Sequence, residues 1–182
     1  MKKEGVIRSP SWTLAQEVIS RGIKLYPSED VKTLYKCIQC GACVGSCPSG
    51  RRTALSVRVI IREVQMGYRK EVLENPGLWS CTTCYTCQER CPRDVKATDI
   101  VKIIRNIAFE EGRAKDRHLV VAANFIKTGH TIPFTEDGKR LRAKLGLDPI
   151  PPTSLKSADA LLEIQEIMKI DGFHNKVVLD KK

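Results

Sequence analysis

The sequence contains few aromatic residues and no long apolar run. Aromatic residues occupy 5% of the 182 positions, and no stretch of about 18 consecutive apolar residues occurs. The apolar stretch 119–123 is far too short to cross a membrane, and the opening residues Met1 to Glu4 do not resemble a signal segment. We therefore expect a soluble, cytoplasmic protein with no transmembrane segment.

Motifs for substrate and nucleotide chemistry are missing as well. The chain has no Gly-x-Gly-x-x-Gly loop and no phosphate-binding Gly-x4-Gly-Lys-Ser/Thr loop. Its three histidines, His118, His130 and His174, are scattered and have no cysteine or carboxylate cluster around them, so we expect ordinary surface or packing roles for them. The sequence predicts no catalytic residue of its own.

What the chain does have is one cysteine spacing, present twice. The spacing is Cys-x2-Cys-x2-Cys-x3-Cys-Pro, and it uses all eight cysteines: Cys37, Cys40, Cys43 and Cys47, then Cys81, Cys84, Cys87 and Cys91. Two-cluster ferredoxins use this run, in which three thiolates hold one [4Fe–4S] cluster and the fourth binds the other cluster. The sequence therefore predicts two [4Fe–4S] clusters and an electron carrier.

Applied to this chain, that pattern gives two crossed ligand sets. The first cluster takes Cys37, Cys40, Cys43 and Cys91, and the second takes Cys81, Cys84, Cys87 and Cys47. Pro48 and Pro92 suit the point where the chain leaves each loop, because proline lacks an N–H and favours the first turn of a helix.

Three other uses of cysteine fit the pattern less well. A structural zinc site is complete with four ligands and gives no reason for a third cysteine and a Cys-Pro in each copy. Structural disulfides need an oxidising compartment. A thioredoxin-like site would show one Cys-x-x-Cys near a βαβ pattern, which is absent.

The chain is strongly basic, with a formal charge of +10. Two oxidised clusters with their thiolates lower this to roughly +6, and no nucleic-acid motif accompanies the charge, so we expect no nucleic-acid partner. Five cations flank the motifs: Arg51, Arg52, Arg90, Arg93 and Lys96. They either balance cluster charge and attract an acidic redox partner, or form an ordinary solvated face, and the sequence leaves both open.

Apolar residues at helical spacing predict an all-α fold. The predicted helices span 13–23, 52–67, 98–112, 116–129, 136–145 and 157–170, with Ser28 capping a further short helix and Thr98 or Asp99 capping the third. Motif and helix thus alternate twice, which predicts a pseudo-twofold arrangement. The expected organisation is an N-terminal helical segment (1–27), an α-helical dicluster ferredoxin domain (28–130) and a C-terminal extension (131–182) with a Pro-rich break.

The last predicted helix has an apolar stripe made of Leu161, Ile164, Ile167 and Met168. The stripe either packs on the chain's own core or serves as a docking arm for a partner.

The cysteine motifs, above all Trp79 to Arg93, resemble the C subunit of soluble heterodisulfide reductase from methanogenic archaea. The resemblance extends over most of the chain in size and layout. It implies an electron-transfer subunit without a substrate site, which relays electrons from a flavin and iron–sulfur A subunit to a catalytic B subunit. There the disulfide of coenzyme M and coenzyme B is reduced, and a hydrogenase or formate dehydrogenase feeds the larger assembly.

Two alternatives stay open beside this resemblance. One is a free dicluster ferredoxin, which the additional terminal helices disfavour because a diffusing carrier does not need them. The other is the iron–sulfur subunit of a succinate dehydrogenase-like or glycolate oxidase-like complex. The chain lacks an upstream [2Fe–2S] module and retains all eight cysteines, which separates it from succinate dehydrogenase and fumarate reductase.

Overall fold

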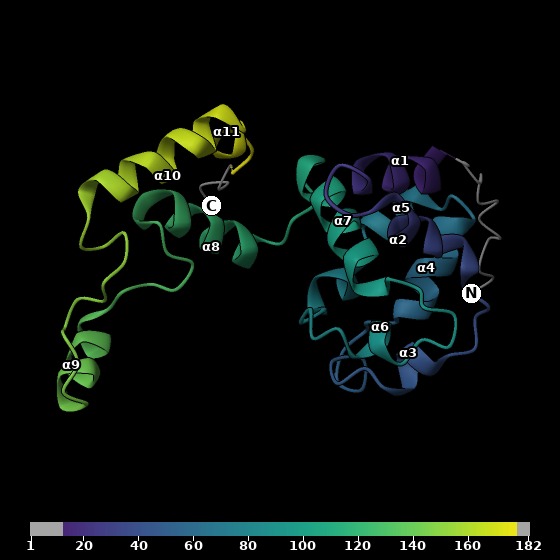
Figure 1. Ribbon diagram of the computed structural model, residues 1–182, viewed down its shortest axis with the longest axis horizontal. Coiled ribbons are helices and arrows are strands. Elements are labelled where there is room, and N and C mark those ends of the chain that lie inside the picture. The colour runs from purple at the N-terminus through teal and green to yellow at the C-terminus, as the bar shows by residue number, and fades with distance from the viewer. Residues whose placement is uncertain (1–12, 178–182) are drawn as a thin grey trace, which may run out of the picture. The chain divides into compact units, whose positions relative to one another are not determined.

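The structure is a computed structural model that describes residues 13–177, and within these residues every regular element is a helix (Figure 1). This confirms the all-α prediction. In the described part of the chain, no helix has the length and apolar character that crossing a bilayer requires.

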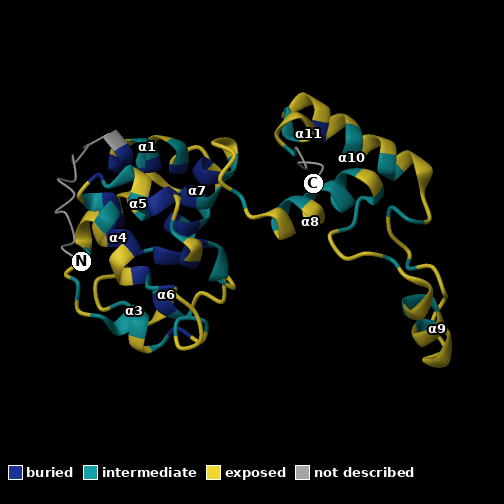
Figure 2. Cartoon of the chain, turned by 180° about the vertical axis from the view of Figure 1, so that it is seen from behind, coloured by how far each residue is buried: buried dark blue, intermediate teal, exposed yellow. Residues whose placement is uncertain are grey.

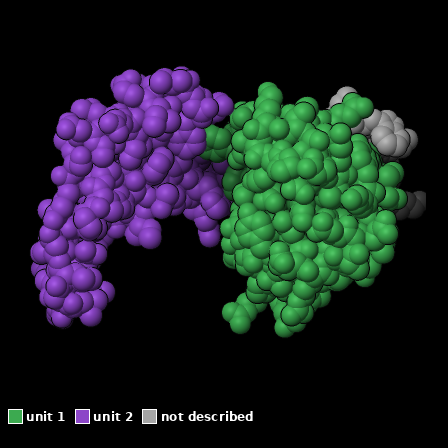
Figure 3. Space-filling view, viewed as in Figure 1, with its two compact units in different colours: residues 1–113 green, residues 114–182 purple. Residues whose placement is uncertain are grey.

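The chain divides into two compact units, one ending at Arg113 and the other beginning at Ala114 (Figure 3). The elements of the first unit are α1 (Thr13–Gly22), α2 (Ser28–Lys32), the 3₁₀-helix η1 (Thr33–Lys36), α3 (Ala42–Gly45), α4 (Val57–Gln65), α5 (Arg69–Leu73), the 3₁₀-helix η2 (Pro76–Ser80), α6 (Thr86–Glu89) and α7 (Ala97–Glu110). Those of the second are α8 (Asp116–Thr128), α9 (Glu136–Lys144), α10 (Ala158–Ile170) and α11 (Phe173–Lys176).

These units differ from the expected division at residues 27 and 130. Helix α1 packs on α2, α4 and α7, and its Leu14 and Val18 are fully buried, so it belongs to the body of the first unit. Helix α8 packs against α10 and thereby belongs to the second unit. In both cases the unit to which the helix belongs is decided by the helices that pack on it. Its distance from the cysteines in sequence does not decide this.

The core of the first unit lies between α4 and α7, which both turn an apolar face inward (Figure 2). In α4 that face is Val57, Ile60, Ile61 and Val64; in α7 it includes Ile100, Ile103, Ile104 and Ile107. Burying each such side chain contributes about 1.5–3 kcal/mol. This core fixes the long helix that follows each cysteine motif.

Close packing at the end of α1 requires a glycine. A β-carbon at Gly22 would lie 2.6 Å from Val31 Cγ1 and 2.7 Å from Ile103 Cδ1. Such distances are well inside van der Waals contact, so a larger residue here would push α1 away from α2 and α7.

The second unit has little core. Met168 is the one buried side chain among its described residues. Helices α8 and α10 are joined by a hydrogen bond from Gln165 Nε2 to Ile126 O (3.1 Å). Of the predicted stripe on α10, Leu161 and Ile164 are half-buried and Met168 is buried, whereas Ile167 is 65% exposed.

The six predicted helices all occur, but two predicted caps are wrong. Ser28 is the first residue of α2, where Pro27 occupies the cap position without a side-chain hydrogen bond. Lys96 occupies the cap position of α7, and its N–H donates to the Thr33 hydroxyl (2.9 Å), which is remote in sequence. The helix predicted at 52–67 begins later, at Val57, because residues 49–54 form turns after the first Cys-Pro.

Candidate metal centres

The two cysteine motifs fold in the same way. A 3₁₀-helix ends one residue before the first cysteine of each, at Lys36 and Ser80. A one-turn helix (α3 or α6) then holds the third cysteine, and a long helix (α4 or α7) follows the Cys-Pro. The equivalent elements also meet, since α3 packs on α6 and α4 on α7. The arrangement is the one expected from the sequence repeat.

Left-handed backbone at matching positions curls both loops. Gln39 and Thr83 have φ values of 60° and 53°, and each precedes the second cysteine of its motif. Gly41 (86°) and Tyr85 (62°) follow that cysteine. These turns reverse the chain around the cysteines, and non-glycine residues at three of the four positions show that the loop conformation is imposed by its surroundings.

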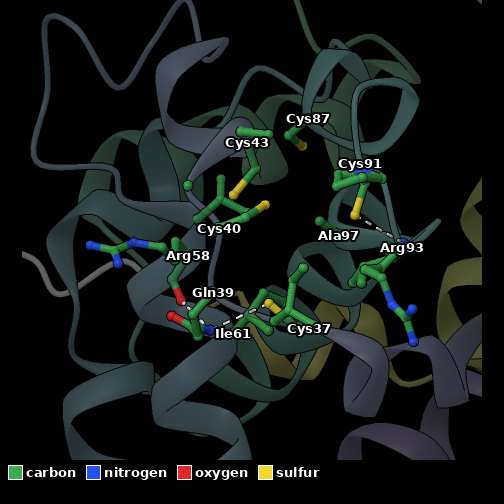
Figure 4. A pocket seen from close by; sticks show the side chains of 16 residues that line it. Cys37, Gln39, Cys40, Cys43, Arg58, Ile61, Cys87, Cys91, Arg93 and Ala97 are labelled. Carbon is green, nitrogen blue, oxygen red and sulfur yellow. Dashed lines mark hydrogen bonds between the residues drawn. The ribbon is translucent and has the colours of Figure 1, made fainter.

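One cavity joins cysteines from both motifs. Its lining includes Cys37, Cys40 and Cys43 from the first motif and Cys91 from the second (Figure 4). In Figure 4 the sulfur atoms of Cys40, Cys43 and Cys91 point into the same space. Cys47 is not part of this lining. The cavity therefore brings together the four residues of the first predicted ligand set.

The second predicted set gathers around Cys87. Burial raises the pKa of the Cys87 thiol, the Thr98 hydroxyl lowers it, and the charges of Cys81, Cys47 and Cys84 raise it again. The charges that act on Cys87 come from the other members of its predicted set, while Cys87 in turn acts on Cys43 of the first set. Cys87 also borders the first cavity, which makes the two groups neighbours.

Hydrogen-bond donors face several of the sulfurs. The backbone N–H of Gly50 donates to Cys47 Sγ (3.2 Å), and that of Val95 donates to Cys91 Sγ (3.3 Å). Gln39 Nε2 donates to Cys37 Sγ at 3.3 Å. Donors of this kind stabilise the negative charge of cluster thiolates.

Burial divides the thiols into two kinds. Cys40 and Cys84 are exposed, while Cys47 and Cys87 are buried. Burial, together with the charges of Cys87 and Cys37, raises the pKa of the Cys43 thiol to about 11, whereas the Thr86 hydroxyl lowers the pKa of Cys84. Since thiolates are the metal ligands, metal binding at Cys43 and Cys87 would release protons.

The cations predicted from the sequence lie in varied places. Arg93 lines the first cavity, Lys96 pairs with Asp94 (2.7 Å), and Arg51 donates to Gly45 O (3.2 Å). Arg52 and Arg90 are exposed. Three further polar residues lie at these sites without a sequence signal that marks them: Gln39 and Arg58 at the first cavity and Arg105 near the second group. Thr98, predicted only as a helix cap, lies beside Cys87.

The residues present fit iron–sulfur clusters. In the part of the chain that the structure describes, no three Cys, His, Asp or Glu side chains converge as ligands of a single metal ion do. A cubane cluster makes a different demand, because each thiolate binds a different iron and the four sulfurs surround a space. Five cysteines line one cavity, the four of the first predicted set and Cys87, and N–H groups donate to Cys37 and Cys91 among them, which meets that demand.

Comparisons with known proteins agree with this site. Residues 33–95 match a family model described as a 4Fe-4S dicluster domain. The iron–sulfur C subunit of the CoB–CoM heterodisulfide reductase of Methanopyrus kandleri is 45% identical over 86% of this chain and 81% of its own length. The C subunit of the H(2):CoB-CoM heterodisulfide,ferredoxin reductase of Methanothermobacter thermautotrophicus is 49% identical over 78% of this chain and 76% of its own length. The C2 subunit of the H(2)/formate:CoB-CoM heterodisulfide,ferredoxin reductase of Methanococcus maripaludis is 44% identical over 85% of both chains.

Proposed function

We propose that this chain, which belongs to the family of C subunits of CoB–CoM heterodisulfide reductase, relays single electrons through two [4Fe–4S] clusters. The family is that of an oxidoreductase complex, and the dicluster domain supports an electron-transfer role. The cavity lined by Cys37, Cys40, Cys43 and Cys91 carries the proposal, since it brings these four cysteines around one space, with Cys87 of the second set also at its border.

In the proposed relay, the first cluster is held by Cys37, Cys40, Cys43 and Cys91, and the second by Cys81, Cys84, Cys87 and Cys47. Each bound cluster supplies a one-electron couple. The chain's own contribution is to keep the two sites adjacent across α3 and α6 and to place N–H donors at their sulfurs.

Metal analysis tests the ligation directly. We expect about eight irons and eight acid-labile sulfides per chain in anaerobically purified protein, because eight thiolates in two complete sets match two cubes. One or two zinc ions with little iron would contradict the proposed ligation.

The proposed partners are an A-type flavin and iron–sulfur subunit as donor and a B-type catalytic subunit as acceptor. The names of two relatives include H(2), and one of them also includes formate, which supports a hydrogenase or formate dehydrogenase in the larger assembly. We further propose that the complex works in the cytoplasm, where cysteines stay reduced.

The second unit favours a complex subunit over a free ferredoxin. It contributes no cysteine and exposes large apolar side chains such as Ile132 and Leu145, at 75% and 66%. A diffusing carrier gains nothing from such a surface. Gel filtration of native extract discriminates: elution near the chain's own 20.4 kDa would indicate a free carrier, and co-elution with large flavoproteins a subunit.

A further expected result concerns catalysis. The isolated chain should accept electrons from a reduced viologen dye but should not reduce the heterodisulfide, because its cysteines are all engaged as ligands and it shows no substrate motif. Addition of the catalytic subunit should restore turnover. Heterodisulfide turnover by the pure, iron-replete chain would contradict the relay role.

A further inference from the structure

Arg105 on α7 reaches the backbone at the start of the second cysteine motif. Its Nε donates to Leu78 O (2.8 Å) and its Nη2 donates to Cys81 O (2.6 Å). Its guanidinium carbon lies 5.9 Å from the centre of the Trp79 ring. These contacts hold a partly buried positive charge against the residue that begins the second ligand set.

No carboxylate among the described residues balances this charge. Within that part of the chain Arg105 takes part in no ion pair, although other arginines of the same unit, such as Arg21 and Arg69, pair with glutamates. The guanidinium is half-buried and lies against the backbone of Cys81, the first residue of the second predicted ligand set. A buried cation without a partner is costly, so its counter-charge is expected at the cysteines.

The first motif provides an internal comparison. Leu34 O is the counterpart of Leu78 O, and it accepts a hydrogen bond from the neutral amide of Gln65 (2.8 Å). At the constant offset between the two motifs, the counterpart of Arg105 is Ile61, which is buried and lines the first cavity. A neutral amide is therefore enough to bind the carbonyl at this position, whereas Arg105 binds the carbonyls of Leu78 and Cys81 and adds a positive charge.

We propose that Arg105 is the internal counter-charge of the second cluster and raises the reduction potential of that cluster. The inference rests on the proposed ligation by Cys81, Cys84, Cys87 and Cys47. Reduction adds one electron to a cluster that is already negative, and a nearby cation in a medium of low polarity stabilises the reduced form. Arg105 acts on the cluster through its charge and does not bind it.

The other cations near the motifs act more weakly. Arg58 and Arg93 line the first cavity, but both side chains are exposed, and solvent and salt screen their charges. Lys102 lies by Tyr85, one residue after Cys84, and pairs with Asp99 (3.3 Å), which offsets its charge. Arg105 alone among these combines partial burial with the lack of a carboxylate partner in the described structure.

Redox titration of the iron-replete full chain tests the proposal. Arg105→Gln keeps a donor for Leu78 O, as Gln65 does for Leu34 O, but removes the charge. At a fixed potential, the ratio of reduced to oxidised second cluster should fall about tenfold, which is 59 mV for a one-electron couple. The first cluster should change much less. Paramagnetically shifted cysteine β-proton resonances assign each step to its ligand set.

Two control variants make the result specific. Arg140→Gln removes an equally charged but exposed side chain on α9 and should leave both potentials unchanged. Arg105→Lys keeps the charge and should stay close to the wild-type potential, and it remains informative if Arg105→Gln does not assemble both clusters. The proposal would be overturned if Arg105→Gln with its full iron content kept the wild-type reduction potential of the second cluster. It would also be overturned if Arg105→Lys lowered the ratio of reduced to oxidised second cluster tenfold. Iron content below that of two clusters in the wild-type chain would instead count against the ligation.

Discussion

Replacing Cys91 by alanine is expected to destroy the same iron–sulfur cluster as replacing Cys37, although Cys91 belongs to the other motif. The physical reason is the cavity that Cys91 shares with Cys37, Cys40 and Cys43. By the same crossed pattern Cys47→Ala should match Cys81→Ala, because Cys47 does not line the cavity that holds Cys37, Cys40 and Cys43. Each variant should lose one of two clusters, which is about half of the iron.

Electron paramagnetic resonance of the reduced variants measures which cluster remains. Cys91→Ala and Cys37→Ala should show one spectrum, and Cys47→Ala and Cys81→Ala the other. The four variants are controls for one another, because each replaces a single cysteine by alanine and removes one thiolate. They differ only in the predicted ligand set that loses it. If Cys91→Ala pairs with Cys81→Ala, each motif ligates its own cluster and the crossed arrangement is wrong.

The sequence could predict the helices because their apolar patterns are local. Val57, Ile60, Ile61 and Val64 recur at helical spacing and do form the buried face of α4. The cysteine runs similarly predict a dicluster domain, which the family model confirms over residues 33–95. Each of these patterns is formed by residues that are only a few positions apart in the sequence. Neither pattern therefore requires knowledge of tertiary contacts.

Features that depend on contacts across the chain were not predictable in this way. The N–H of Lys96, at the cap position of α7, donates to the hydroxyl of Thr33, a contact that no local capping pattern indicates. Arg105 is one of several polar residues on the amphipathic helix α7, and only its contacts with Leu78 and Cys81 distinguish it from the others. The boundary at Arg113 depends on the packing of α8 against α10, which the sequence does not show, and the predicted cysteine domain therefore extended past α8 to residue 130.

Removing residues 157–182 should weaken assembly with the other reductase subunits while leaving the iron content intact. The buried core that surrounds the cysteines is formed by residues from Leu14 to Ala108, so α10 and α11 contribute nothing to it. In the second unit, loss of α10 uncovers the face of α8 that Gln165 contacts. Iron analysis and co-purification of the other subunits with the tagged chain measure the two effects separately.

Substitutions on α10 locate the contact within that segment. Leu162 and Ile167 are 57% and 65% exposed, so Leu162→Lys with Ile167→Lys should leave the packing of α10 on α8 in place. If this face contacts a partner, two buried charges should weaken binding at least about tenfold, or 1.4 kcal/mol. Lys169→Gln changes an exposed residue of the same helix that pairs with Glu166, and it should assemble normally.

Loss of iron in the shortened chain would show that α10 supports the clusters. Full assembly of both the shortened and the doubly substituted chains would leave α10 without a docking role. Because the buried core around the cysteines ends at Ala108, we expect the shortened chain to keep its iron.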